Sequence, residues 1–441
     1  MKPLARRINH LLVWLLVGFA AHAQTSGQTL PLEEAIALGV SLDPWLAGSR
    51  YRQQALSSEA VAAGSLPDPT VNLAAGSLPV DTFDINQEAM TQFKVGLSQV
   101  FPRGDTRALS RQQKEQLAQQ EPLLRLDRKA QVAATVARLW LDVYRAQQTI
   151  HLIEKDRALF EYLVAAARSG YETALGRARQ QDLIRAQLEL IRLEDRLTAL
   201  HLRREAAQRQ LSEWVDGDAD RPLPRALPSA DTSIPFDGLL ARSRNRQGDY
   251  ELISHHPALQ ALDKRIEAMT TAVDLARQKY RPQWGLNAQY GYRDDDPMGR
   301  DRADLFSLGI TFDLPLFPGN RQDRELRAAL ARAEALKTDK QLLARQLLAE
   351  LDASAARLRR LNERNALYSK QLLPRMAEQA DAALTAYNND DGDFAEAVRA
   401  RIAELDAKIE ALSLAVDRQQ LIARINYLLV EADTAQSESA P

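Results

Sequence analysis

A heptad repeat of apolar residues runs through most of the chain and restricts its fold more than any other feature. Between residues 104 and 215 the only proline is Pro122, and few turn-forming residues occur before Ser169 and Gly170. This period predicts long helices packed side by side. At ~1.5 Å per residue, a helix over about 104–168 would reach roughly 95 Å, so we expect a rod or a tube. The repeat comprises Val132, Val136, Leu139, Val143, Ala146, Ile150 and Ile153, then Leu183, Ala186, Leu190, Leu193, Leu197 and Leu200.

Four short stretches change from this period to strict alternation, which predicts strands at about 69–77, 91–101, 283–293 and 304–314. One interpretation is four half-buried strands on a soluble core. The other is a membrane β-barrel, with lipid against the apolar face and water against the polar face. Strand length and aromatic residues near the strand ends favour the barrel. The expected lipid-facing residues are Trp284, Leu286, Tyr290, Tyr292, Phe306, Leu308, Ile310 and Phe312.

The chain is an internal repeat, because matching landmarks recur at a nearly constant separation. Phe101-Pro102 matches Phe317-Pro318, and Tyr171 matches Tyr387. Four strands cannot close a membrane barrel, and open sheet edges are not tolerated in lipid. We therefore expect oligomerisation, with three copies supplying twelve strands. The expected repeats are 24–230, with long helices over about 104–168 and 176–215, and 231–441, with long helices over about 320–386 and 393–431.

The first residues predict a secretory signal peptide over 1–23. A basic segment with Lys2, Arg6 and Arg7 precedes an apolar run, which ends in the A-x-A pattern Ala21-His22-Ala23. An uncleaved anchor helix is the alternative, which the short apolar run disfavours. A signal peptide without a later apolar helix of spanning length indicates the bacterial periplasm or a location beyond it.

Composition and motifs argue against an enzyme. The chain has no Cys, which excludes thiolate metal sites and cysteine nucleophiles, and its net charge of −2 disfavours nucleic-acid binding. Nucleotide-binding, serine hydrolase and zinc protease motifs are missing. No histidine after residue 23 has metal-ligand spacing, so structural or capping roles are expected for His151, His201, His255 and His256. We predict no catalytic residue, no cofactor and no resident metal.

Several segments resemble the TolC-like outer-membrane efflux proteins, over nearly the whole chain after residue 23. They are Leu32-Glu33-Glu34-Ala35-Ile36 with Asp43-Pro44, His256-Pro257-Ala258-Leu259 leading to Ala276–Pro282, Phe101-Pro102-Arg103-Gly104, Leu314–Arg321, Tyr171–Gln187 and Tyr387–Arg401. The resemblance implies a mainly α fold with a small β part, in which a homotrimer forms a twelve-stranded barrel in the outer membrane above long periplasmic coiled-coil helices. It also implies docking to a periplasmic adaptor (membrane fusion protein) and an inner-membrane RND-type pump. The tip and junction segments look most like the heavy-metal or cation efflux branch.

The two turns between long helices carry the candidate functional residues. Asp390, Asp391 and Asp393 are either a solvated turn or a periplasmic gate, where carboxylates from three copies would repel one another and attract cations. The family's glycine three residues after the tip tyrosine is replaced by Ala174 and Asp390. The candidate adaptor-docking residues, which could instead cap helices, are Gly170, Gly176, Arg177, Gln181 and Gly392.

These observations predict a passive exit duct of a tripartite efflux system in the outer membrane, with most of its mass in the periplasm. The alternative is a soluble periplasmic coiled-coil scaffold or adaptor protein.

Overall fold

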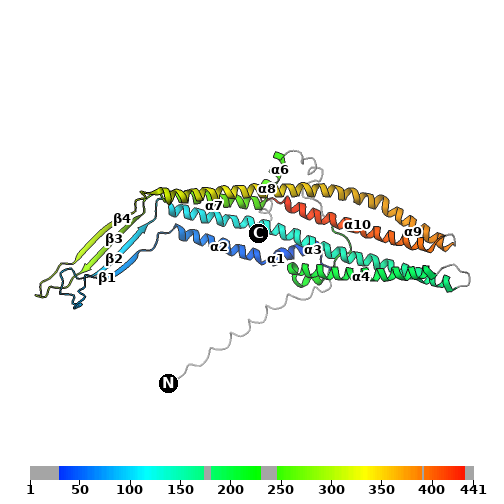
Figure 1. The fold of residues 1–441 in the computed structure, drawn as a ribbon, viewed down its shortest axis with the longest axis horizontal. Coiled ribbons are helices and arrows are strands. Elements are labelled where there is room, and N and C mark those ends of the chain that lie inside the picture. Colours follow the sequence, from blue (N-terminus) through cyan, green and yellow to red (C-terminus); the bar gives the residue numbers. More distant parts are fainter. Residues whose placement is uncertain (1–28, 173–179, 230–245, 390–391, 433–441) are drawn as a thin grey trace, which may run out of the picture. The chain divides into compact units, whose positions relative to one another are not determined.

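A computed structural model describes residues 29–172, 180–229, 246–389 and 392–432 (Figure 1). The predicted signal peptide and the predicted repeat boundary near residue 230 lie outside these ranges. The first half contains α1 (Leu32–Leu42), α2 (Pro44–Gly64), β1 (Thr70–Gly76), β2 (Gln92–Phe101), α3 (Thr106–Glu172) and α4 (Gln180–Val215). The second contains α6 (Arg246–Ser254), α7 (Pro257–Gln278), β3 (Trp284–Tyr292), β4 (Leu305–Phe312), α8 (Gln322–Leu367), α9 (Leu373–Asn388) and α10 (Phe394–Leu428). The predicted class, mainly α with a small β part, is confirmed.

The longest element is α3, whose 67 residues span roughly 100 Å at ~1.5 Å per residue. It begins two residues after Gly104, whose φ of 44° lies in the left-handed region that glycine tolerates. The corresponding segment of the second half differs from the single helix expected over 320–386. A π-helical turn, Tyr368–Leu372, separates α8 from α9, and Pro374 follows it. Because proline has no N–H, residue 374 cannot continue the α-helical hydrogen-bond pattern.

The chain forms two compact units, and each draws segments from both halves of the sequence. The first unit comprises Met1–Leu42, Val132–Asp231 and Leu358–Ala423. Its core is built from the predicted heptad residues, because Val132, Val136 and Leu139 are buried together with Trp140. The Trp140 indole donates a hydrogen bond to the Leu30 carbonyl (3.0 Å), which fixes the segment before α1. A second cluster packs α3 against α4 and the start of α10.

The second unit comprises Asp43–Gln131, Thr232–Arg357 and Arg424–Pro441. It contains the antiparallel sheet, whose four described strands have the order β1-β2-β3-β4 (Figure 1). The helices of this unit connect to one end of the sheet, and the polar loops 77–91 and 293–304 join the strands at the other end. The sheet therefore extends beyond the helical part of its own unit.

Candidate functional site

One face of the sheet is apolar across all four strands, with Gln99 of β2 as its one polar residue among the described strands. The eight predicted lipid-facing residues of β3 and β4 all lie on it, with between 40% and 70% of each residue exposed. The register aligns Leu73 of β1 with Val95 of β2, Val95 with Tyr290, and Tyr290 with Phe306. Near the helices, the rings of Trp284 and Phe312 pack with centroids 5.1 Å apart. No described strand residue on this face is charged.

Most residues on the opposite face are polar or glycine, and Ala74, Val100 and Leu305 are its apolar exceptions. A single row across it consists of Asn72, Gly96, Gln289 and Ser307. Lys94 lies on this face and is the one charged residue within the described strands. An exposed sheet that is apolar on one side and polar on the other fits a wall between lipid and water better than it fits a soluble core.

The sheet has two open edges, because neither β1 nor β4 has a second strand partner among the described residues. Unpaired backbone groups on an exposed edge favour pairing with another chain. In the described part of the chain, no helix is both long and apolar enough to cross a membrane.

A network of polar contacts fixes the junction between strands and helices. The Arg103 guanidinium forms an ion pair with Asp313 and donates hydrogen bonds to the carbonyls of Lys279 (3.2 Å) and Arg281 (3.0 Å). The Gln283 N–H donates to the Asp313 carboxylate (2.7 Å), so this carboxylate bridges the ends of β3 and β4. A Cβ on Gly104 would approach the Arg281 Cδ to 2.6 Å, which leaves no room for a larger residue at this turn.

The turn before α10 has a defined structure at two predicted positions. Asp393 caps α10, because its carboxylate accepts a hydrogen bond from the Ala395 N–H (3.2 Å). A Cβ on Gly392 would lie 2.7 Å from the Tyr387 nitrogen, so the turn requires glycine there. The rings of Tyr387 and Phe394 meet edge to face, with centroids 5.3 Å apart. Asp393 and Gly392 therefore both have a structural role in this turn.

The other residues predicted at the two turns lie outside the described residues or near the ends of α3 and α4. Asp390, Asp391, Gly176 and Arg177 lie outside the described residues. Gly170 lies near the end of α3, and Gln181 is exposed in the first turn of α4. Gate and docking roles for these residues remain predictions.

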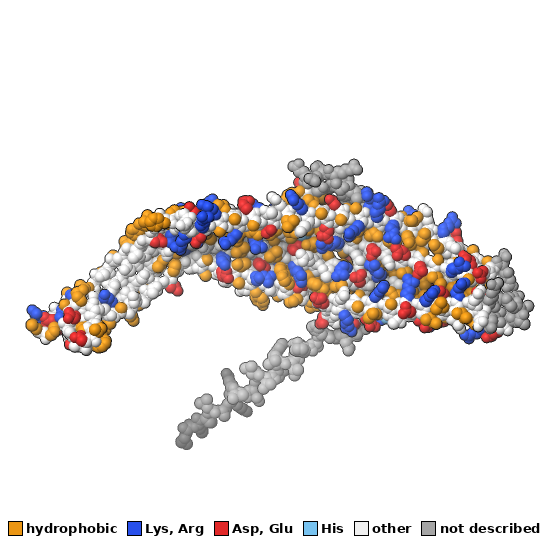
Figure 2. Space-filling view, viewed as in Figure 1, with side chains coloured by type: hydrophobic (Ala, Val, Ile, Leu, Met, Phe, Trp, Pro, Cys, Tyr) orange, Lys and Arg blue, Asp and Glu red, His pale blue; other side chains and the backbone are white. Residues whose placement is uncertain are grey.

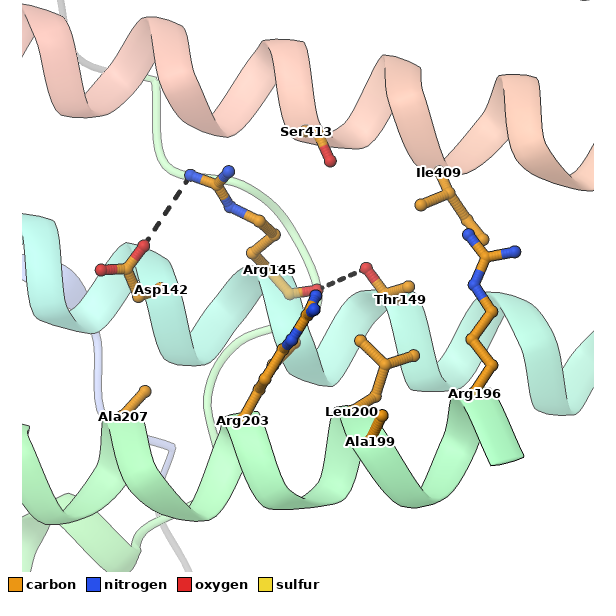
Figure 3. A pocket seen from close by; sticks show the side chains of 11 residues that line it. Asp142, Arg145, Thr149, Arg196, Ala199, Leu200, Arg203, Ala207, Ile409 and Ser413 are labelled. Carbon is orange, nitrogen blue, oxygen red and sulfur yellow. Dashed lines mark hydrogen bonds and ion pairs between the residues drawn. The ribbon is translucent and has the colours of Figure 1, made fainter. Parts of the chain in front are cut away.

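A cleft of about 460 Å³ opens between α3, α4 and α10 in the first unit (Figure 3). Arg145 lines it and pairs with Asp417 (2.7 Å), and Arg196 lines it and pairs with Asp406 (2.6 Å). These pairs attach α10 to α3 and α4. The cleft contains no nucleophile beside a base, and the described residues include no group of His, Asp and Glu that could hold a metal ion. Sequence reasoning missed these pairs, because their members are more than 200 positions apart.

Buried polar groups lie where α3, α7 and α10 meet in the second unit. His256 caps α7: its Nδ1 accepts a hydrogen bond from the Ala258 N–H (3.3 Å), and its Nε2 lies 3.2 Å from the Tyr427 carbonyl. Burial lowers the pKa of His256, which keeps the ring neutral so that Nδ1 can accept. The Tyr427 hydroxyl donates to Asp127 (3.2 Å), and burial raises the pKa of Tyr427 to about 12. The capping role expected for the histidines is confirmed at His256.

Comparisons with known proteins agree with these features. A sequence model of the family described as "Outer membrane efflux protein" matches residues 250–431. The multidrug resistance outer membrane protein MdtP of Escherichia coli O6:H1 is 24% identical over 298 residues, which cover 66% of this chain and 58% of MdtP. The match therefore spans less than two thirds of the length of this relative.

Solved structures share the fold over nearly the whole chain. The outer membrane protein VceC of Vibrio cholerae superposes with a TM-score of 0.72 at 17% identity, covering 90% of this chain and 95% of VceC. CusC superposes with a TM-score of 0.73 at 14% identity, covering 91% and 92%. At these identities the structures show the fold alone. Together with the family match, they confirm the resemblance inferred from the sequence.

Proposed function

We propose that this chain, which resembles the TolC-like outer-membrane efflux proteins, is one protomer of a trimeric channel that conducts substrate passively out of a bacterial cell. The observation that carries the proposal is the two-faced sheet with open edges on β1 and β4. Lipid would contact the face of Trp284 and Phe306, and water would fill the lumen on the other side. The helices would extend into the periplasm.

Closure by neighbouring copies can be tested by cross-linking, because the chain has no Cys. Within one chain, β1 and β4 are three strand spacings apart, roughly 14 Å. A disulfide needs Cα atoms within about 7 Å, so it can join these strands only between copies. We expect Leu73→Cys, combined in turn with cysteine at Phe306, Leu308, Ile310 or Phe312, to give cross-linked species of up to three chains for one or two adjacent combinations. No cross-link at any position would contradict closure by β1 and β4.

Conduction is tested by reconstituting the purified protein in a planar bilayer. We expect discrete single-channel steps from heat-sensitive trimers extracted from outer membranes. A soluble monomer in the periplasmic fraction would instead support the alternative of a coiled-coil scaffold. That alternative leaves the exposed apolar face of the sheet without a function.

The gate proposal concerns Asp390, Asp391 and Asp393. Three copies would bring up to nine carboxylates to the periplasmic end of the tube, where they would repel one another and attract cations. Replacing all three by Asn removes the charge, and Asn at 393 keeps a capping side chain on α10. We expect higher single-channel conductance or altered block by cations. Unchanged conductance and block would leave these residues as turn formers.

The proposed partners are a periplasmic adaptor and an inner-membrane RND-type pump, with the tip residues around Gly170, Gly176, Arg177, Gln181 and Gly392 as the docking surface. We expect Arg177→Glu to reduce co-purification of the adaptor while the trimer persists. Retained binding would remove Arg177 from the interface. The name of MdtP suggests drugs as substrates and the branch resemblance suggests metal cations. Susceptibility of a deletion strain to a panel of both would discriminate between them.

A further inference from the structure

Exposed apolar residues follow the end of β4. Leu314 and Leu316 follow Phe306, Leu308, Ile310 and Phe312 at the same two-residue interval, and they are 59% and 68% exposed. Phe317 comes next and is 87% exposed. The Leu316 N–H donates to the Leu314 carbonyl (2.9 Å), so the chain turns tightly at Pro315. We call Leu314, Leu316 and Phe317 the junction anchor.

The strand alone is short for a bilayer. Its 8 residues rise roughly 21 Å along the membrane normal, taking ~3.4 Å per residue and a tilt of about 40°. The apolar band of an outer-membrane barrel is about 25 Å tall. The junction anchor would add apolar surface at the end of β4 that leads to the helices.

Three exposed arginines follow the junction anchor. Arg321 precedes α8, and Arg324 and Arg327 follow at intervals of three residues; all three are exposed, and although Arg321 lies near enough to Glu325 to lower the pKa of that carboxyl, no guanidinium of the three forms a hydrogen bond or a close ion pair with the described residues. The acidic residues of the same turns are already engaged. Asp323 accepts from the Tyr280 hydroxyl (2.6 Å), and Glu325 pairs with Lys279 (2.8 Å).

Positive side chains at the start of a helix are unfavourable, because the helix dipole places positive charge there as well. The backbone N–H groups of the first turn also favour an anion. Asp323 and Glu325 offset part of this effect within the first turn, and an anion outside the chain would offset the rest. Figure 2 shows hydrophobic side chains adjoining a group of Lys and Arg side chains where the strands connect to the helices.

We propose that the junction anchor inserts among the acyl chains of the periplasmic leaflet and that Arg321, Arg324 and Arg327 bind the phosphates of its phospholipid headgroups. Guanidinium groups match phosphate oxygens in two-point contacts, and aromatic residues favour the bilayer interface. This inference rests on the proposed channel function. A second copy of the chain could also cover Phe317, but it would have to supply both an apolar surface and carboxylates. A phospholipid supplies both an apolar surface, in its acyl chains, and a negative charge, in its phosphate.

Spin labelling tests the insertion, because Phe317→Cys creates the one cysteine in the chain. The labelled trimer is reconstituted in vesicles of phosphatidylethanolamine and phosphatidylglycerol at a molar ratio of 3:1. Contact with lipid predicts high accessibility of the nitroxide to oxygen and low accessibility to the water-soluble Ni(II)EDDA. Low accessibility to both would mean burial by a second copy and would overturn the proposal, as would high accessibility to Ni(II)EDDA.

Two control positions separate failure of this inference from failure of the channel itself. Leu308→Cys, on the apolar face of β4, is the control for contact with lipid. Leu342→Cys, exposed on α8, is the control for contact with water. If the label at position 308 reports lipid while the label at 317 does not, only the junction anchor is refuted. If the label at 308 reports water, the proposed function fails.

The arginines are tested by replacing all three with Gln and counting bound phosphatidylglycerol by native mass spectrometry after extraction from the same vesicles. We expect at least a threefold loss of bound lipid. The matched control replaces Arg332, Arg345 and Arg359, which are also exposed on α8, and removes the same charge. An unchanged count in the first variant, or an equal loss in both, would overturn the headgroup contact.

Discussion

A charge placed on either face of β4 gives the sharpest test of the membrane interpretation. Leu308 and Ser307 are adjacent residues near the middle of this strand, and they lie on opposite faces of the sheet. Leu308 is 65% exposed on the apolar face, opposite Ala288. Ser307 lies on the polar face, opposite Gln289. Lysine at either position adds the same charge, and the larger gain in side-chain volume falls on Ser307→Lys, so greater damage from Leu308→Lys would have to come from the face on which the charge lies.

The expected difference is large. A lysine facing lipid near the bilayer midplane costs about 2–4 kcal/mol, and removing Leu308 also forfeits favourable transfer of its side chain into lipid. The charge alone would shift the folding equilibrium of one protomer by roughly 30- to 900-fold, and a trimer contains three such sites. A lysine facing a water-filled lumen remains hydrated, so Ser307→Lys should change stability by less than about 1 kcal/mol.

The assay is the fraction of heat-modifiable trimer in outer-membrane extracts, followed by urea titration in lipid vesicles. We expect Leu308→Lys to abolish or strongly reduce the trimer and Ser307→Lys to resemble the unmodified protein. Equal tolerance of the two variants, or greater damage from Ser307→Lys, would refute the assignment of lipid and water to the two faces.

Three further substitutions test the helical part and the junction. Gly104→Ala should destabilise the trimer by about 1–3 kcal/mol per chain, because φ is 44° and the added Cβ would meet the Arg281 side chain. The measurement is the thermal midpoint of the trimer, which should fall; an unchanged midpoint would mean that the turn relaxes freely. His256→Asn should remove the pH dependence of folding stability below about pH 6.5. In that range a histidine of lowered pKa stays neutral in the folded chain but is protonated in the unfolded chain, so the unmodified protein loses stability as the pH falls. Asn keeps a capping oxygen without titrating, and His151→Asn on exposed helix surface is the control. Trp140→Phe should cost about 2–4 kcal/mol in chemical denaturation, because it opens a cavity and removes the hydrogen bond to the segment before α1; a loss below 1 kcal/mol would show that this contact is dispensable.

Periodicity predicted the parts of the fold that depend on burial. Val136, Leu193 and Leu197 occupy heptad positions and are buried, because a helix surface repeats nearly every seven residues. The faces of β3 and β4 were predictable for the same reason, since alternate residues of a strand point to opposite sides. These are local rules, and one sequence is enough to apply them.

Features that depend on distant partners could not be found in this way. The pairing of Arg196 with Asp406 follows from how α4 and α10 pack, and no spacing in the sequence records it. Asp393 was considered for its charge, whereas the structure shows that its carboxylate caps a helix. Phe317 served in the sequence analysis only as a landmark of the internal repeat beside Pro318, because its exposure depends on where the turn at Pro315 leaves it.

Glycine placement gives a reason, independent of hydrophobicity, to assign the polar face to the lumen. All five glycines of the described strands lie on this face: Gly76, Gly96, Gly285, Gly291 and Gly309. At two of them a polar side chain from the opposite residue fills the space that a Cβ would take, since Thr311 lies over Gly285 and Asn287 over Gly309. Side chains on the concave side of a curved sheet are crowded together, and glycine relieves that crowding. The largest side chains, including Trp284 and Phe306, lie on the other face, where curvature spreads them apart. Residue size and residue polarity therefore indicate the same direction of curvature, which would place the polar face inside the proposed barrel.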